Sequence, residues 1–198
     1  MTRIIAGSAG GRRLTTPPGD GTRPTSDRVR EALFSALESW FGTWEGVHVL
    51  DLYAGSGAVG LEAASRGAAS VVLVEHDRRT AGVAAGNART LGLRDVEVVA
   101  AATRTALSRP PARPVDLVFS DPPYPVEDEV VDADLAALVE HGWLAEGAVV
   151  VVERSRRSRE PRWPDGFGRG RRRKYGETTL WRAEWQPGTP DHDDPVQE

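Results

Sequence analysis

The sequence predicts an α/β fold, in which helices cover both faces of a mostly parallel sheet. Short Val-rich apolar runs alternate along the chain with longer segments of helical periodicity. Nearly continuous apolar strands are typical of a sheet buried on both faces, and strands that are joined by helices run parallel. The expected strands are 47–52, 70–75, 95–99, 115–120 and 147–153, and the expected helices between them are 57–67, 78–91, 103–108 and 128–141.

The two ends of the chain add further elements to this pattern. Extended segments between 171 and 185 are separated by a glycine-containing turn, so we expect a final antiparallel pair that completes a seven-stranded sheet. Residues 3–6 and 12–14 are short apolar segments separated by glycines, which predicts an N-terminal β-hairpin. Residues 25–42 begin with good N-cap residues and carry an apolar stripe up to Trp40, which predicts a helix that packs on the sheet.

Length and composition indicate one globular domain. The chain has 198 residues, of which 39% are apolar, and this is enough to bury a full core. No apolar run approaches the roughly 18 residues of a membrane span, and the N-terminus does not resemble a signal peptide. The absence of cysteine fits a cytoplasmic protein. We expect a domain over 1–185, comprising a basic hairpin arm (1–24), the packing helix (25–42) and a catalytic core (43–185), followed by an acidic, disordered tail (186–198).

Basic residues gather at two places in a chain whose net charge is −4. Residues 1–30 carry six Arg against two Asp, and residues 154–174 carry nine Arg and one Lys against two acids. Such asymmetry is typical of segments that contact anions, although a solvated Arg-rich surface remains the alternative. The residues expected to contact nucleic-acid phosphates are Arg3, Arg12, Arg13, Arg23, Arg28, Arg30, Arg172 and Lys174.

A glycine-rich loop follows the first expected strand of the core. Residues 55–60 read Gly-Ser-Gly-Ala-Val-Gly at the start of a helix, where the backbone can approach a ligand closely. The next strand ends at Glu75, where a carboxylate can accept ribose hydroxyls. Nicotinamide-dependent enzymes share these features. Asp51, just before the loop, favours S-adenosylmethionine, because enzymes that use it place an acid there, near the ammonium of the methionine moiety.

The strand 115–120 ends in the sequence Asp121-Pro122-Pro123-Tyr124. In an open α/β sheet, ligands lie beyond the carboxyl ends of the strands, so this tetrad should face the cofactor. Asp121 and the Pro122 carbonyl can accept hydrogen bonds from an aromatic amine whose ring stacks on Tyr124. These contacts stabilise the positive charge that grows on the amine nitrogen during methylation. We therefore expect Asp121, Pro122 and Tyr124 to be catalytic.

Taken together, these motifs make the chain resemble the bacterial small-subunit ribosomal RNA guanine-N2 methyltransferases of the RsmD type. The resemblance runs from Met1 to about Trp185. The glycine loop is common to many methyltransferases, whereas residues 23–34 joined to Asp-Pro-Pro-Tyr are more specific. The motifs that carry the resemblance are 3–7, 11–14, 23–34, 51–57, 121–124, 142–144 and 174–178.

The resemblance implies a Rossmann-like class I methyltransferase fold and S-adenosylmethionine as the cofactor. It implies methylation of the exocyclic N2 of a guanine, at position 966 of 16S ribosomal RNA, in the small subunit or its assembly intermediate. We expect a monomer without a metal and without a membrane partner.

The chain departs from the common methyltransferase pattern after the third strand of the core. An Asp or Asn usually contacts adenine there, but this sequence has alanines, so backbone groups of Ala102 and Thr103 are expected to hold the adenine. The expected cofactor-binding residues are therefore Asp51, Tyr53, Gly55, Ser56, Gly57, Glu75, Ala102 and Thr103.

Three other functions share part of this pattern. A DNA adenine-N6 methyltransferase usually carries a target-recognition domain, for which the chain has no room. A protein-glutamine methyltransferase normally has Asn in place of Asp121. A non-catalytic nucleotide-binding module on RNA would not need the Asp121 carboxylate.

Overall fold

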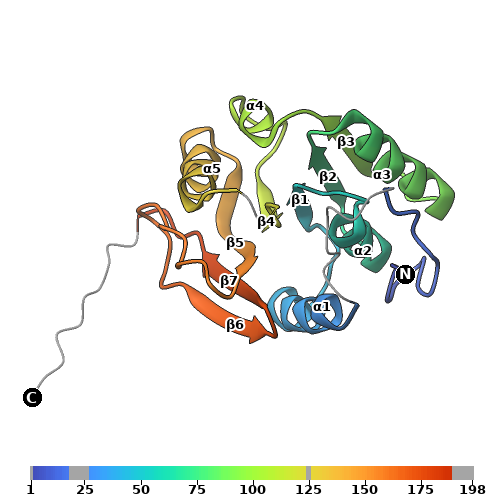
Figure 1. Cartoon of the computed structure of the whole chain (residues 1–198), viewed down its shortest axis with the longest axis horizontal. Coiled ribbons are helices and arrows are strands. Elements are labelled where there is room, and N and C mark those ends of the chain that lie inside the picture. Colours follow the sequence, from blue (N-terminus) through green and yellow to red (C-terminus); the bar gives the residue numbers. More distant parts are fainter. Residues whose placement is uncertain (1, 18–26, 124–125, 189–198) are drawn as a thin grey trace, which may run out of the picture.

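The computed structural model describes residues 2–17, 27–123 and 126–188, which contain one seven-stranded sheet in the order β3-β2-β1-β4-β5-β7-β6 (Figure 1). Neighbouring strands from β3 to β5 run parallel, and β7 runs antiparallel to both β5 and β6. The mostly parallel sheet and its final antiparallel pair are therefore confirmed. The strands are β1 (His48–Leu52), β2 (Ser70–Glu75), β3 (Val96–Ala100), β4 (Val115–Ser120), β5 (Leu144–Ser155), β6 (Arg171–Tyr175) and β7 (Thr178–Glu184).

Helices cover both faces of this sheet. Figure 1 shows α4 and α5 on one side, with α1 and α2 on the other. Alternate strand residues divide between two cores, because Leu50 and Leu52 pack with α4 and α5, whereas Val49 packs with α1, α2 and α3. The central strands read as apolar runs because both of their faces are covered. The helices are α1 (Asp27–Phe41), α2 (Ala58–Arg66), α3 (Arg78–Leu91), α4 (Thr103–Leu107) and α5 (Asp128–Glu140).

The expected N-terminal β-hairpin is wrong. Within residues 2–17 the chain folds back on itself, but it forms only an isolated antiparallel bridge between Arg3 and Arg13. Backbone bonds from Ile4 to Arg12 and from Leu14 to Thr2 join its two arms, but no strand forms in this range, and other N–H groups of the segment donate to α2. Ile5 and Ala6 donate to the Glu62 carboxylate at 2.6 and 3.0 Å, and Ala9 donates to the Ser65 hydroxyl at 2.9 Å.

Close approach to α2 is built into this N-terminal segment. Gly7 has φ of 80°, and a Cβ at this position would stand 1.9 Å from the Ser65 carbonyl oxygen. Only glycine fits such a contact. The segment is therefore attached to α2 by long-range bonds in addition to the few backbone bonds between its own arms.

No helix in the described part of the chain is long and apolar enough to cross a membrane.

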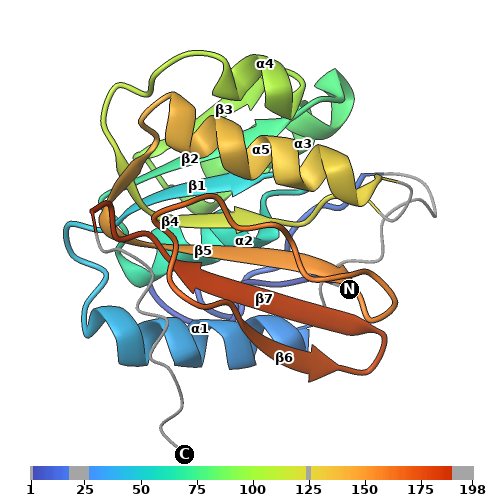
Figure 2. The same cartoon turned by 90° about the vertical axis from the view of Figure 1, so that its left-hand side faces the viewer.

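Helix α1 buries Val29, Leu33, Phe34 and Leu37 against the sheet. Figure 2 shows α1 running along the edge formed by β6 and β7.

Candidate active site

The strand order reverses direction between β1 and β4, and their carboxyl ends lie side by side. Leu52 pairs with Ser120 in parallel register, and the next residue, Asp121, donates its backbone N–H to the Leu52 carbonyl at 3.4 Å. The glycine loop after β1 and the Asp-Pro-Pro-Tyr segment after β4 therefore start next to each other. Ligands of open α/β sheets bind at such a reversal.

The glycine loop turns sharply between β1 and α2. Tyr53 has φ of 59° and Gly55 has φ of 56°, both in the left-handed region. A Cβ on Gly55 would meet no heavy atom of the described residues within 4 Å, so this turn opens into space rather than into packing. Such an open, sharply turned loop at the start of a helix can accept a ligand against its backbone.

Glu75 lies at the carboxyl end of β2 and holds this loop. Its buried carboxylate accepts the N–H of Gly55 at 3.0 Å and the N–H of Asp77 at 2.9 Å. Helix α3 is capped by Asp77, which accepts from Thr80 at 2.8 Å. The carboxylate of Glu75 is thus directed at the glycine loop, and the cap of α3 is a separate residue.

Asp51 supports the same loop from within β1. It is 2% exposed and accepts the Gly60 N–H, in the first turn of α2, at 2.8 Å. Burial raises the pKa of Asp51 to about 7, the bond from Gly60 opposes this shift, and the charge of Glu75 adds to it. Its place beneath α2 makes Asp51 a support of the loop, and its expected contact with an ammonium group stays a prediction.

Tyr53 joins the glycine loop to α4 and α5. Its hydroxyl donates to the Asp134 carboxylate at 2.6 Å and also bonds the Thr103 side chain. Burial and the neighbouring Asp134 raise the pKa of Tyr53 above its usual range. Thr103 is buried at the first position of α4, and the exposed Ala102 precedes it as the N-cap. Thr103 thus contacts the loop through Tyr53, and the expected contact of Ala102 and Thr103 with adenine stays a prediction.

Asp134 was missed by the sequence reasoning, although the sequence contained a signal. Its neighbours Val131, Leu135 and Leu138 form the buried stripe of α5. Asp134 falls within that stripe, three residues after Val131. An acid in the buried stripe of a helix requires a polar partner, because an unpaired buried charge is strongly disfavoured.

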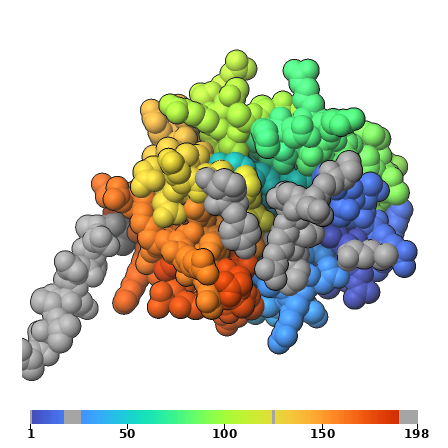
Figure 3. Space-filling model, viewed as in Figure 1, coloured from blue at the N-terminus to red at the C-terminus, as the bar shows by residue number. Residues whose placement is uncertain are grey.

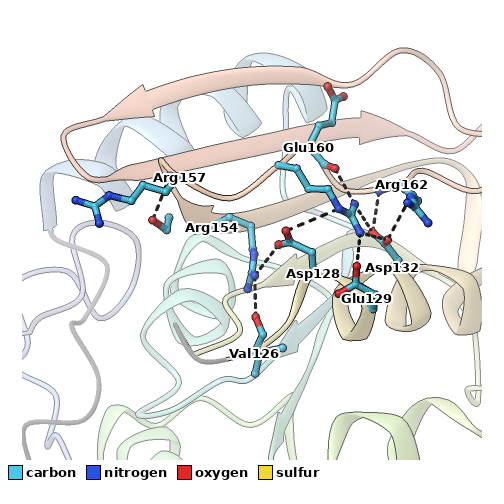
Figure 4. Close-up of polar contacts among 10 residues, drawn as sticks. Val126, Asp128, Glu129, Asp132, Arg154, Arg157, Glu160 and Arg162 are labelled. Carbon is cyan, nitrogen blue, oxygen red and sulfur yellow. Dashed lines mark hydrogen bonds and ion pairs between the residues drawn. The ribbon is translucent and has the colours of Figure 1, made fainter.

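Arg154, near the end of β5, holds the chain just beyond the Asp-Pro-Pro-Tyr segment (Figure 4). Its guanidinium is buried and donates to the Val126 carbonyl and to the Asp128 carboxylate, both at 2.8 Å. Arg159 extends the ion network over α5, pairing with Asp132 at 2.6 Å. The chain is therefore attached to β1 at Asp121, where the segment begins, and to β5 at Val126, two residues beyond its end. Arg154 was also missed, because it follows the apolar run 148–152 and lies just outside the expected strand 147–153.

Asn87 of α3 ties the N-terminal segment to the glycine loop. Its amide nitrogen donates to the carbonyls of Thr15 at 2.9 Å and Ser56 at 3.0 Å, and its amide oxygen accepts the Thr15 N–H at 2.9 Å. Asn87 is 5% exposed. A single buried amide thus connects two segments that are far apart in sequence, and no local pattern could have shown it.

The structure removes Arg30 from the residues expected to contact RNA. Arg30 is fully buried, and its guanidinium bonds the Asp27 carboxylate at 2.6 Å and the carbonyls of Arg3 and Ala58 at 2.7 and 3.2 Å. It closes the contact between α1 and the N-terminal segment, so it cannot reach a phosphate. A count of basic residues along the sequence cannot distinguish such a buried, hydrogen-bonded arginine from one on the surface.

The other residues expected to contact phosphates differ in exposure and in whether their charged groups already have partners within the protein. Arg12 is exposed, but its guanidinium caps the end of α3 by donating to the carbonyls of Thr90 and Leu91. Arg3 is mostly exposed and pairs with Asp27 at 3.4 Å. Arg13, Arg28, Arg172 and Lys174 are exposed. Tyr124, Arg23 and the tail beyond residue 188 lie outside the described residues.

Comparison with known proteins identifies relatives over nearly the whole chain. The model of the family described as Conserved hypothetical protein 95 matches residues 2–184. The Escherichia coli K12 protein named Ribosomal RNA small subunit methyltransferase D is 36% identical over 178 residues, which cover 90% of this chain and 87% of that protein.

Solved structures show the same fold. The Escherichia coli protein yhhF superimposes with a TM-score of 0.82 at 32% identity, covering 93% of this chain and 98% of the other. An RNA methyltransferase from Salinibacter ruber, in complex with S-adenosyl-L-homocysteine, gives a TM-score of 0.61 at 20% identity, covering 85% of this chain and 97% of the other. At this lower identity the likeness concerns the fold.

Proposed function

The chain belongs to the methyltransferase family described as Conserved hypothetical protein 95, and we propose that it transfers a methyl group from S-adenosylmethionine to the exocyclic N2 of a guanine in 16S ribosomal RNA. One observation carries the proposal. The glycine loop and the Asp-Pro-Pro-Tyr segment leave the sheet side by side, linked by the bond between the Asp121 N–H and the Leu52 carbonyl. A cofactor loop and an acceptor for an amine are thus brought to one place.

The residues present fit S-adenosylmethionine. Gly55 turns in the left-handed region toward open space, which leaves room for a ligand against the loop. Glu75 lies at the end of β2, where a carboxylate can accept ribose hydroxyls. The Thr103 side chain bonds Tyr53 of the loop, and Ala102 precedes it as the N-cap of α4, so backbone groups of both can hold the adenine. The cofactor supplies an electrophilic methyl group on a sulfonium.

The protein's own part in the chemistry falls to Asp121 and its neighbours. The amino group of guanine is a weak nucleophile because its lone pair is delocalised into the ring. The Asp121 carboxylate and the Pro122 carbonyl accept its two N–H bonds, and this favours a pyramidal nitrogen and stabilises the growing positive charge. The guanine is flipped out of its stack and lies against the ring of Tyr124.

The substrate is proposed from the relatives and from the distribution of charge. The Escherichia coli relative is named as a small-subunit ribosomal RNA methyltransferase. This name supports a small-subunit ribosomal RNA as the substrate, and we propose guanine 966 of 16S RNA, which the family resemblance implies, as the target in the small subunit or its assembly intermediate in the cytoplasm. Exposed basic residues such as Arg13, Arg28 and Lys174 are suited to contacts with RNA phosphates.

The test is methyl transfer to small subunits that lack the modification, with Asp121→Ala as the variant. We expect turnover to fall by roughly 10²–10³ because an acceptor that acts in the transition state is lost. Cofactor binding, measured by calorimetry, should stay within about twofold of wild type. Full activity of the variant, or a product other than N2-methylguanine, would contradict the proposal.

A further inference from the structure

The edge of the sheet formed by β6 and β7 carries an exposed set of basic side chains beside α1. Figure 3 shows these strands, in red and orange, lying against the blue α1. In the antiparallel register Arg171 pairs with Arg182, and Arg173 pairs with Leu180. Directly paired residues project from the same face of a sheet. Leu180 packs in the core with α1, so Arg171, Arg173 and Arg182 all project on the α1 side.

A surface hollow lies at this place. Its volume is about 290 Å³, and it is lined by Trp40 of α1 together with Arg169, Arg171, Arg182 and Glu184. Trp40 falls in the apolar stripe expected for α1, yet it is 40% exposed. The Arg182 guanidinium lies 4.9 Å from its ring centroid. Exposed aromatic rings among basic side chains are the combination that binds single-stranded nucleic acid.

The arginines of this half of the chain fall into two classes. Arg154, Arg156, Arg159 and Arg162 each pair with a carboxylate. Within the described residues, no carboxylate lies at ion-pair distance from Arg169, Arg171, Arg173 or Arg182.

Burial and neighbouring like charges act together on Arg182. Burial lowers the pKa of Arg182, and the charges of Arg171 and Arg173 lower it further, while Glu184 opposes them. A set of mutually repelling cations with no carboxylate at ion-pair distance among the described residues attracts a polyanion.

The register also relates this surface to the site. Arg171 pairs with Arg182, Arg182 with Val151, Val151 with Phe119, and Phe119 with Asp51. The pair formed by Arg171 and Arg182 is therefore level with Phe119 and Asp51, near the carboxyl ends of β4 and β1. Neighbouring strands lie about 4.8 Å apart, so β6 lies roughly 14 Å from β4. One RNA strand can contact both places.

We propose that Trp40, Arg169, Arg171, Arg173 and Arg182 form a second RNA-contacting surface, which binds a single-stranded stretch of the substrate RNA beside the base to be methylated. This inference rests on the proposed function and extends it. The arginines contact phosphates, and the ring of Trp40 stacks on an unpaired base.

The test compares two double variants that each remove two positive charges. Arg171→Gln/Arg173→Gln alters the proposed surface, whereas Arg156→Gln/Arg162→Gln alters arginines that are already paired with acids. The first variant should raise the KM for small subunits on the order of tenfold and leave kcat unchanged. Its log affinity for a single-stranded RNA oligonucleotide should fall less steeply with log salt, by about 1.4 in slope, because two phosphate contacts are lost. The second variant should match wild type in both measurements.

Trp40→Ala and Trp40→Phe test the stacking part separately. Trp40→Ala should weaken oligonucleotide binding about fivefold or more, and Trp40→Phe should retain most of the binding because a ring face remains. Equal effects of the two double variants, or unchanged oligonucleotide binding with Arg171→Gln/Arg173→Gln, would overturn the inference. Loss of binding to small subunits but not to the oligonucleotide would indicate a protein partner and would also overturn it. Failure of wild type to methylate small subunits would instead count against the proposed function, since oligonucleotide binding is measured independently.

Discussion

Replacing Arg154 by methionine should slow methyl transfer without weakening cofactor binding. The guanidinium of Arg154 donates to the Val126 carbonyl, directly beyond the Asp-Pro-Pro-Tyr segment, and to Asp128. Methionine keeps an unbranched apolar stem in place of the arginine methylenes but removes both bonds. Arg159 offers a matched control, because it belongs to the same ion network and pairs with Asp132, yet no contact joins it to Val126.

The size of the effect follows from the contacts. Hydrogen bonds to charged groups contribute about 1.5–3 kcal/mol each, so Arg154→Met should lower the free energy of unfolding by roughly 3 kcal/mol. In this variant the Asp128 carboxylate still lies 3.8 Å from the Arg159 guanidinium, so its charge keeps a partner and the loss of stability is limited. A domain with a stability of about 5–15 kcal/mol tolerates this loss. Displacement of a reacting group by about 1 Å costs on the order of 10² in rate, so kcat should fall roughly 10- to 100-fold.

Three measurements separate positioning from general stability. Calorimetry with S-adenosylmethionine should give an affinity within about twofold of wild type for Arg154→Met. The reason is that the glycine loop is held by bonds from Gly55 and Gly60 to other residues, which the variant does not alter. Single-turnover methyl transfer should show the loss of rate, and thermal unfolding should show the loss of stability. Arg159→Met should leave the rate nearly unchanged. An equal loss of rate in the Arg159 variant, or a parallel loss of cofactor affinity in the Arg154 variant, would refute the positioning role.

Two further predictions concern Asp51 and Glu75, the carboxylates that hold the glycine loop. Since burial raises the pKa of Asp51 to about 7, the native protein holds a proton there that the unfolded chain releases near pH 4. The free energy of unfolding should therefore fall as the pH rises from about 4 to above 7. Asp51→Asn should flatten this fall, as measured by melting temperatures across that range. A fall of equal size in the variant would assign the pH dependence to other groups. Glu75→Ala should weaken S-adenosylmethionine binding at least tenfold in calorimetry while the protein remains folded, and unchanged affinity would remove Glu75 from the cofactor site.

Much of the fold could be predicted because its determinants are local. A strand that is buried on both faces must be apolar along its length, so β1, β4 and β5 could be recognised without knowledge of their neighbours. The positions of Glu75 and Asp121 could be predicted for a related reason. Each directly ends or follows such a strand, and in a parallel sheet these ends meet at one edge.

The features that escaped prediction depend on partners distant in sequence. The N-terminal segment has the composition of a hairpin, but the N–H groups of Ile5 and Ala6 bond to Glu62, which lies more than 50 residues away. Arg30 reads as one more basic residue until its bonds to the carbonyls of Arg3 and Ala58 are known. Asn87 and Arg154 likewise act through carbonyl oxygens, which carry no signal in the sequence.

Contact with acids, rather than the count of basic residues, decides how a chain with a net charge of −4 can bind a polyanion. Arg154 and Arg159 are neutralised by acids of α5, so they stabilise the site and contribute little to the field outside the protein. Arg171 and Arg173 lack such partners among the described residues and face solvent. The acidic residues offset the overall charge without cancelling this local positive potential, because exposed charges farther apart than about 8–10 Å are largely screened at physiological salt. RNA affinity should therefore follow the unpaired arginines and be insensitive to the net charge.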